Sequence, residues 1–143
     1  MSDIHSLVVD IGKKAREASR SLAVASSLQK KEALIFGAES IKENTENILE
    51  QNKKDLDIGA TKGLSNALMD RLLLNEERIG SMIGGLEAIA NQNDPIGEVM
   101  EAWRRPNGLE IKRVRTPLGV IGVIYESRPN VTADAGALCL KAG

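Results

Sequence analysis

Residues 118–130 read Leu-Gly-Val-Ile-Gly-Val-Ile-Tyr-Glu-Ser-Arg-Pro-Asn, and this stretch decides the fold class. Its first seven residues are apolar on both alternating faces, which is typical of a strand in a parallel sheet that is covered on both sides. A polar loop follows at 125–130, and the pattern after it predicts a helix from about Thr132 through Lys141, with Gly143 as its stop. A strand, a loop and a helix are two thirds of a βαβ unit, so the stretch predicts an α/β protein.

The returning strand of this unit is missing from the 143 residues. A crossover helix normally returns to a parallel neighbour, and a buried strand without a neighbour leaves its backbone polar groups unpaired. Composition alone, at 42% apolar and 27% charged residues, would fit one complete soluble domain. We nevertheless expect the N-terminal part of a larger α/β protein, in which residues 117–143 begin the parallel sheet.

Residues 1–93 carry helical patterns. Apolar residues recur every three or four positions over 2–25, which predicts an amphipathic helix. Ser26 with Gln29 forms a capping-box pattern that opens a second helix, expected to run to about Gln51. Asn52 can cap a short third helix over 52–58.

Two further helices are expected before residue 93. Ser65 or Asn66 can start a brief helix that ends near Leu72, and Asn75 caps a longer one with an apolar stripe. Three glycines lie in that longer helix, Gly80, Gly84 and Gly85. Each glycine costs about 1 kcal/mol of helix propensity relative to alanine, so we expect a neighbouring backbone to pack closely there. A phosphate-binding loop is disfavoured because no strand precedes these glycines.

A β-hairpin is predicted at 97–116. Pro106-Asn107-Gly108 is a strong turn signal between β-leaning segments at 99–105 and 109–115. The apolar alternation slips at 112–113, which predicts a bulge there. The hairpin carries five basic residues, Arg104, Arg105, Lys112, Arg113 and Arg115. A solvated or subunit-facing ribbon is favoured over an anion-binding role.

Charge and residue counts exclude several function classes. A net charge of −1 gives no nucleic-acid footprint. One cysteine and one histidine cannot form an internal disulfide or a common zinc site, so we expect no metal. Cys139 is interpreted as a small buried hydrophobe and His5 as structural or solvated. No signal peptide or membrane-spanning run is readable, and we expect a cytoplasmic protein without membrane or nucleic-acid partners.

The polar loop after the apolar stretch is the candidate site, because ligands of open parallel sheets bind beyond the carboxyl ends of the strands. Ser127, Arg128 and Asn130 could recognise a polar, anionic substrate. In the alternative, Asn130 or Thr132 only caps the following helix and Glu126 pairs with Arg128. From the residues alone, both interpretations stay open.

Residues 115–134 and 137–141 together resemble the gamma-glutamyl phosphate reductase family of the aldehyde dehydrogenase superfamily. The stretches at 52–56, 70–72, 94–97 and 107–109 agree with it, so the resemblance covers essentially the whole chain. The superfamily usually has Pro-Trp-Asn after the strand, whereas this sequence has Glu126-Ser127-Arg128. That departure points to the branch that acts on acyl phosphates.

The resemblance implies an incomplete aldehyde dehydrogenase-like cofactor-binding domain and an activity. The activity is NADPH-dependent reduction of L-glutamate 5-phosphate to L-glutamate 5-semialdehyde, with phosphate release, in proline biosynthesis. A cysteine thiolate would attack the acyl phosphate and hydride from NADPH would reduce the thioester. The family's nucleophilic cysteine is expected beyond Gly143, so this chain would hold no catalytic residue and be inactive alone.

Within the chain, the resemblance places substrate contacts at Ser127, Arg128 and Asn130, whereas no residue is assigned to the cofactor. It also implies a homo-oligomer at full length, paired through the 97–116 ribbon. Two other functions remain: a non-catalytic helical interaction module, or the reductase part of another superfamily enzyme, such as a bifunctional proline-pathway synthetase. Met1 followed directly by the first helix argues against a preceding kinase domain.

Overall fold

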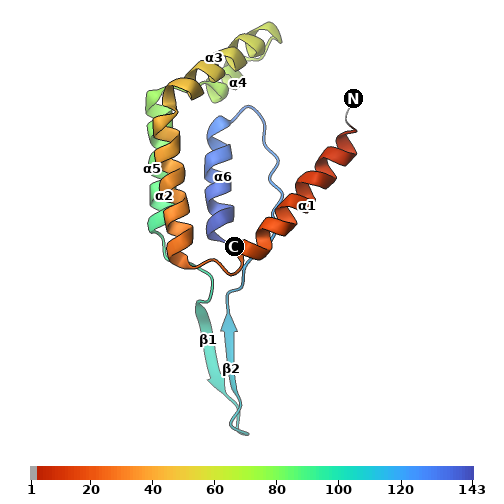
Figure 1. The fold of residues 1–143 in the computed structure, drawn as a ribbon, viewed down its shortest axis with the longest axis vertical. Helices are drawn as coiled ribbons and strands as arrows, with labels where there is room; N and C mark the ends of the chain where they lie inside the picture. Colours follow the sequence, from red (N-terminus) through yellow and green to blue (C-terminus); the bar gives the residue numbers. More distant parts are fainter. Residues whose placement is uncertain (1–2) are drawn as a thin grey trace.

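The structure is a computed structural model that describes residues 3–143. Over these residues the elements follow in the order α1 (Ile4–Leu22), α2 (Ser27–Glu43), α3 (Thr45–Thr61), α4 (Asn66–Leu72), α5 (Glu76–Asn91), β1 (Val99–Arg104), β2 (Glu110–Val114) and α6 (Pro129–Lys141). Figure 1 shows α2, α5 and α6 grouped together, the hairpin projecting from one end of this group, and α3 with α4 at the other end.

Helices α2, α5 and α6 enclose the main core. Its buried residues are Leu34, Ala38, Leu86, Ile89, Ala90 and Ala137. A second cluster, of Leu74, Ile79 and Met82, lies where α5 begins and also contacts Ile48 and Leu49 of α3. The two clusters fix how α5 lies against its neighbours, and α5 contributes to both.

Capping side chains start α2, α4 and α5 where the sequence predicts. Ser26 Oγ accepts from the backbone N–H of Gln29 at 3.2 Å, and Gln29 Oε1 accepts from the N–H of Ser26 at 2.8 Å, which completes the capping box. Ser65 caps α4 and Asn75 caps α5. These bonds satisfy amide groups that a helix start otherwise leaves unpaired.

The predicted boundary at residues 51 and 52 is wrong. Helix α2 ends at Glu43, and α3 runs unbroken past Asn52 to Thr61. Asn52 lies in the middle of α3 and its side chain is buried. Its Nδ2 donates to Leu72 O and its Oδ1 accepts from Leu74 N–H, both at 2.8 Å. Asn52 therefore fixes the α4–α5 link to α3 instead of capping a helix.

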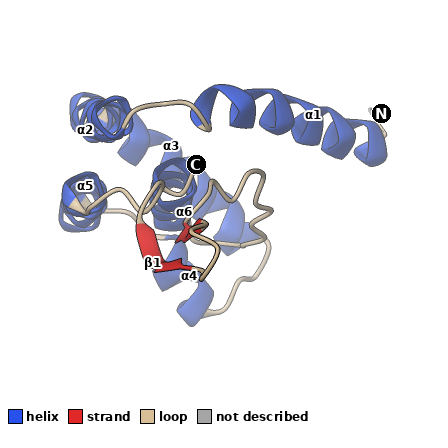
Figure 2. Cartoon of the chain, turned by 90° about the horizontal axis from the view of Figure 1, so that it is seen from below, coloured by secondary structure: helices blue, strands red, loops and turns tan. Residues whose placement is uncertain are grey.

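Helix α1 stands apart from the α2, α5 and α6 group (Figure 2). It ends at Leu22 rather than near residue 25, and its expected start at Ser2 lies outside the described residues. None of its described residues is buried, and its large apolar side chains Ile4, Leu7, Val8 and Ile11 are exposed. Among residues 3–143, no helix has both the length and the apolar character that a membrane crossing requires.

The expectation of close backbone packing at the α5 glycines is wrong. A Cβ placed on Gly80 or Gly84 would meet no described atom within 4 Å, and one on Gly85 would lie 3.3 Å from a side-chain oxygen of Asp134. The reason is that α6 approaches α5 at Gly85 through a side chain, whereas Gly80 and Gly84 face open space.

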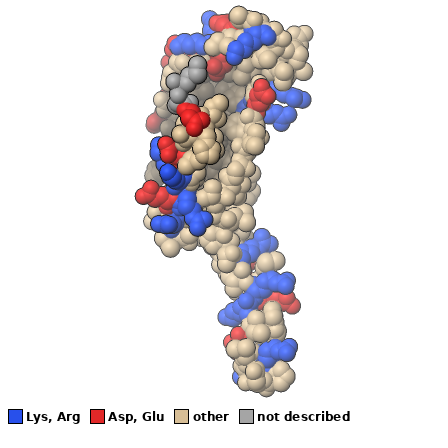
Figure 3. Space-filling model, turned by 90° about the vertical axis from the view of Figure 1, so that its right-hand side faces the viewer, with Lys and Arg blue, Asp and Glu red and all other residues tan. Residues whose placement is uncertain are grey.

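The hairpin forms as predicted, with its irregularity on the other strand. Val99 pairs with Val114 and Glu101 with Arg113, so the extra residue is Met100 of β1, opposite the 113–114 step. Gly108, at φ +88°, provides the left-handed turn conformation that side chains disfavour. Charged side chains of both signs lie along the ribbon in Figure 3, between uncharged ones, and two of its arginines form ion pairs, Arg113 with Glu101 and Arg115 with Glu98.

The apolar stretch at 118–124 does not form the predicted strand in the described chain. Near its start, the N–H of Leu118 donates to Ala142 O at 3.2 Å and the N–H of Gly119 to Gly143 O at 3.3 Å. The rest is exposed, with Ile124 fully so. A strand needs a neighbouring strand for its hydrogen bonds, and among residues 3–143 no strand lies beside this stretch. The result is a mostly helical structure with a two-stranded antiparallel sheet, consistent with an incomplete α/β domain.

Candidate functional site

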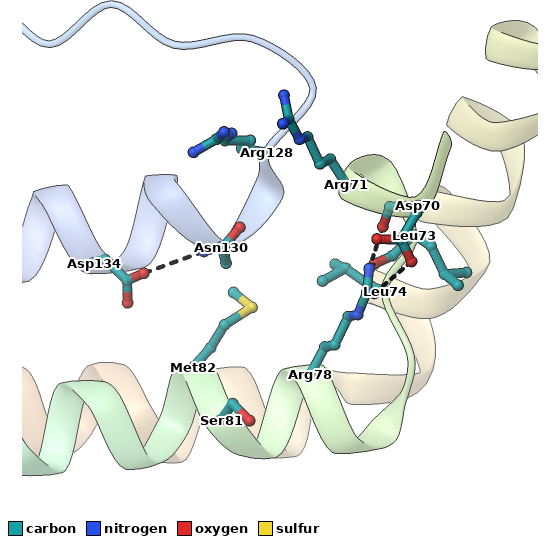
Figure 4. A pocket seen from close by; sticks show the side chains of 10 residues that line it. All are labelled: Asp70, Arg71, Leu73, Leu74, Arg78, Ser81, Met82, Arg128, Asn130 and Asp134. Atoms are coloured by element: carbon teal, nitrogen blue, oxygen red, sulfur yellow. Dashed lines mark hydrogen bonds and ion pairs between the residues drawn. The ribbon is translucent and has the colours of Figure 1, made fainter. Parts of the chain in front are cut away.

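A pocket of about 380 Å³ lies between α4, the start of α5 and the start of α6 (Figure 4). It is lined by ten residues, Asp70, Arg71, Leu73, Leu74, Arg78, Ser81, Met82, Arg128, Asn130 and Asp134. Apolar side chains form its floor, and three guanidinium groups lie on its walls. This volume falls in the range of small-molecule sites.

Two of the three predicted site residues line this pocket. Arg128 and Asn130 do, whereas Ser127 does not. Ser127 has a φ of +51°, which is uncommon for a residue other than glycine, and it turns the chain into α6. Pro129 then takes the first turn of the helix, where its missing N–H costs nothing. The turn at Ser127 thus sets the direction in which Arg128 leaves the backbone.

The capping alternative for these residues is wrong. Helix α6 begins at Pro129, three residues before the predicted start, and no side chain caps it. Asn130 Nδ2 donates to Asp134 Oδ2 at 3.3 Å, and the Thr132 hydroxyl bonds that of Tyr125 at 2.7 Å. Within residues 3–143 no ion pair joins Glu126 to Arg128.

The pocket's arginines differ in what they bind. Arg78 Nη2 contacts Asp70 Oδ1 at 2.7 Å, while its Nη1 donates to Leu73 O at 2.8 Å and to the backbone oxygen of Asp70. Arg78 therefore ties α4 to α5 and closes one wall. The guanidiniums of Arg71 and Arg128 have no hydrogen-bonding or ionic partner among the described residues, and Figure 4 shows both at the same rim of the pocket.

Sequence reasoning did not identify Arg71, Arg78 or Asp134 as site residues. Arg71 belongs to the Asp70-Arg71-Leu72 stretch that carries part of the resemblance, which was the available signal. Asp134 likewise ends the 115–134 stretch that carries the resemblance, whereas Arg78 has no motif signal and reaches the pocket through the packing of α5.

The described lining of the pocket can bind an anion but contains no thiol. Guanidinium groups bind carboxylates and phosphates through paired hydrogen bonds, and two of them here have no protein partner. Cys139, the single cysteine, is half-buried on α6 and does not line the pocket, and His5 is exposed on α1. The described pocket residues can therefore bind a ligand through charge and hydrogen bonds, and none of them is a thiol.

A second polar cluster lies at the opposite end of α5 and α6. Lys30 Nζ lies 2.5 Å from Asp94 Oδ2, and both side chains are nearly buried. Ser27 Oγ donates to Asp94 Oδ2 at 2.8 Å, the N–H of Ile96 donates to Asp94 Oδ1 at 2.9 Å, and Lys141 Nζ donates to Ala90 O at 3.2 Å. Burial raises the pKa of Asp94, but the hydrogen bonds from Lys30, Ile96 and Ser27 together hold it below its usual value. The cluster joins α2, the segment after α5, and α6.

The described residues therefore define part of an α/β protein with a pocket at the start of α6, at which the guanidiniums of Arg71 and Arg128 have no described protein partner. No family model matches the chain. Over 140 residues it is 58% identical to the gamma-glutamyl phosphate reductase of Allorhizobium ampelinum, and over 141 residues 56% identical to that of Rhodospirillum rubrum. These matches cover 98% and 99% of this chain but 33% of each relative.

Solved structures agree with these relatives. The gamma-glutamyl phosphate reductase of Thermotoga maritima matches with a TM-score of 0.90 at 43% identity, over 94% of this chain and 32% of that one. The Saccharomyces cerevisiae enzyme of the same name matches with a TM-score of 0.84 at 34% identity, over 93% and 34%. The resemblance is confirmed: the chain is homologous to gamma-glutamyl phosphate reductases and spans about a third of their length.

Proposed function

We propose that the protein containing this chain reduces L-glutamate 5-phosphate to L-glutamate 5-semialdehyde with release of phosphate, in proline biosynthesis. The observation that carries this proposal is the 56–58% identity, over nearly the whole chain, to proteins named gamma-glutamyl phosphate reductase. The chain spans 33% of those relatives and its pocket holds no thiol. The 143 residues alone are therefore expected to be inactive.

The proposed reaction adds two electrons and two protons. One hydrogen replaces the phosphate group at the acyl carbon, and one proton goes to the departing phosphate. A reductase takes these electrons from a reduced nicotinamide, and the proposed form is NADPH. The turn before α6 does not carry the glycine pattern of a pyrophosphate-binding turn, because α6 begins with Arg128 and Pro129. No described residue is therefore assigned to the cofactor.

The substrate contacts are proposed at the start of α6. Arg128 and Asn130 line the pocket, and Ser127 fixes the turn before them. An unpaired guanidinium suits the carboxylate and phosphate groups of L-glutamate 5-phosphate. Arg128 is the residue whose geometry supports this role best, since it has no described protein partner.

The hairpin at 97–116 is proposed as the ribbon through which full-length copies pair. The chain is proposed to be the N-terminal part of an aldehyde dehydrogenase-like domain. The full-length protein is proposed to lie in the cytoplasm. The strands of the hairpin expose Val99, Met100, Trp103 and Val114, which lie 40–55% exposed. Exposed apolar side chains on a projecting strand pair are typical of interaction surfaces. In the full-length protein, Trp103→Glu should shift the sedimentation velocity distribution toward smaller species. An unchanged distribution would contradict a role for the ribbon in pairing.

The activity is tested on the full-length protein in the reverse direction. Glutamate 5-semialdehyde, phosphate and the oxidised cofactor are supplied, and formation of NADPH is followed by absorbance. We expect that reduction of NADP to NADPH requires both the semialdehyde and phosphate. Absence of turnover with this substrate would refute the proposed function, and faster turnover with NAD than with NADP would refute the cofactor.

A further inference from the structure

The pocket between α4, α5 and α6 contains charges of both signs in an asymmetric arrangement. Arg71 and Arg128 lie at one rim without described protein partners, and Asp134 lies on the α6 wall. The two other charged residues of the pocket, Arg78 and Asp70, pair with each other. The groups left for a ligand are therefore two guanidiniums and one carboxylate.

This combination matches the two charged groups of an α-amino acid. An α-carboxylate accepts paired hydrogen bonds from a guanidinium, and an α-ammonium donates to a carboxylate. Asp134 uses one oxygen to accept from Asn130 at 3.3 Å. Its Oδ1 lies 3.3 Å from where a Cβ on Gly85 would be, so the missing side chain at Gly85 leaves that oxygen room beside α5.

The acyl phosphate end of the proposed substrate fits this pocket poorly. A phosphate group carries about two negative charges and would lie in the same pocket as the Asp134 carboxylate. The described lining also contains no thiol, the nucleophile of the proposed reaction. Both observations favour a position of the acyl phosphate away from this pocket.

We propose that this pocket recognises the amino-acid end of the substrate, with Arg71 and Arg128 binding the α-carboxylate and Asp134 the α-ammonium. The pocket then determines which acyl phosphate is reduced, while the reaction takes place beyond its mouth. This inference rests on the proposed function for the identity of the substrate. Arg71 and Asp134 are the specificity residues that it adds.

The test uses the full-length protein and first measures binding without turnover. L-Glutamate carries both charged groups of the amino-acid end, whereas glutarate lacks the ammonium. Titration calorimetry should show about tenfold tighter binding of L-glutamate than of glutarate to the wild type, and Asp134→Asn should remove this preference. The introduced amide keeps an oxygen that can accept from Asn130 but has no charge for an ammonium.

Arg71→Met should weaken L-glutamate binding about 10- to 100-fold, the usual effect of losing a hydrogen bond to a charged group. Arg71→Lys should restore part of it. The matched control is Arg20→Met, which removes the same charge from an exposed position on α1, outside the pocket, and should change nothing. Circular dichroism of each variant establishes that the helices are intact.

Kinetics in the reverse direction then separate the two ends of the substrate. Arg71→Met should raise KM for glutamate 5-semialdehyde by about the factor seen in binding, and leave KM for phosphate within about threefold. A rise in KM for phosphate with an unchanged KM for the semialdehyde would overturn the proposal. An L-glutamate affinity that is the same in the wild type, Asp134→Asn, Arg71→Met and Arg71→Lys would also overturn it. A wild type that binds L-glutamate but does not turn over the semialdehyde would refute the proposed function alone.

Discussion

Replacing Asp94 by asparagine should loosen the junction of α2, the segment after α5, and α6. Asp94 accepts from Lys30 at 2.5 Å, from Ser27 at 2.8 Å and from Ile96 at 2.9 Å. Asparagine retains an oxygen for one of these donors but removes the negative charge opposite Lys30. Lys30 is 3% exposed, and its other partner is Lys141 O at 3.4 Å.

The size of the effect follows from this burial. Removing one partner of a buried ion pair typically costs about 3–5 kcal/mol, because the remaining charge stays desolvated and uncompensated. Since the introduced amide can still accept a hydrogen bond, the lower limit of about 3 kcal/mol applies here. That corresponds to roughly a 100-fold rise in the local opening constant.

Amide hydrogen exchange in the full-length protein measures this opening directly, without requiring that the whole chain unfold in one step. Peptides covering the start of α2 and the Ile96 amide should exchange roughly 100-fold faster in Asp94→Asn. The matched control is Glu50→Gln, which breaks the exposed Lys54–Glu50 pair at 3.1 Å and should change exchange by less than about tenfold. Exchange near Ile96 within about threefold of the wild type would refute the assigned role of the buried pair.

The same carboxylate gives a pH dependence of known sign. Its pKa in the folded protein is held below the unfolded value of about 3.9, so it contributes full stability above that pH. The contribution is lost as the pH falls through the lowered pKa. Protection factors around Ile96 should therefore be flat between about pH 7 and 5 and fall below about pH 4, with the fall absent in Asp94→Asn. A decline already complete at about pH 5 would contradict the lowered pKa.

Two further predictions concern single side chains, and a third concerns the isolated chain. Ser26→Ala removes the α2 capping box and should cost about 1 kcal/mol, measured as faster exchange of the Gln29 amide. Asn52→Ala leaves the buried Leu74 N–H and Leu72 O without partners and should cost about 1–3 kcal/mol at the Leu74 amide. Asn52→Asp keeps an acceptor for Leu74 but buries a carboxylate against the Leu72 carbonyl oxygen, and should not cost less. The isolated 143-residue chain exposes Val120, Ile121 and Ile124, and should bind an apolar dye and unfold over a broad range. A monodisperse monomer with cooperative thermal unfolding would contradict this last expectation.

Features set by a few neighbouring residues could be predicted from the sequence. The caps at Ser26, Ser65 and Asn75 act within three residues, and the turn at Gly108 requires only its own backbone conformation. Asn52 was misassigned because the same amide that can cap a helix also binds two backbone groups across the fold. The local pattern does not distinguish these uses.

The strand predicted at 118–124 shows the opposite situation. Its apolar pattern indicates a segment made to be covered on both faces, and the pattern is unambiguous. Pairing, however, depends on neighbours, and only the amides of Leu118 and Gly119 find backbone partners among the described residues, near Gly143. The pattern therefore indicates what the segment requires, whereas the described residues decide what it forms.

The pocket depends on how α6 is held at its far end. Helix α6 has 13 residues and a length of about 20 Å, with Arg128 and Asn130 at one end and Lys141 at the other. Lys141 donates to Ala90 at the end of α5 and accepts from Lys30, which Asp94 holds in place. Together with the packing of Ala133 and Ala137 in the core, these contacts set the orientation of α6 and so help to set where Arg128 lies relative to Arg71. Local sequence does not show that the two arginines lie close together, because their proximity results from how α6 packs against the rest of the fold.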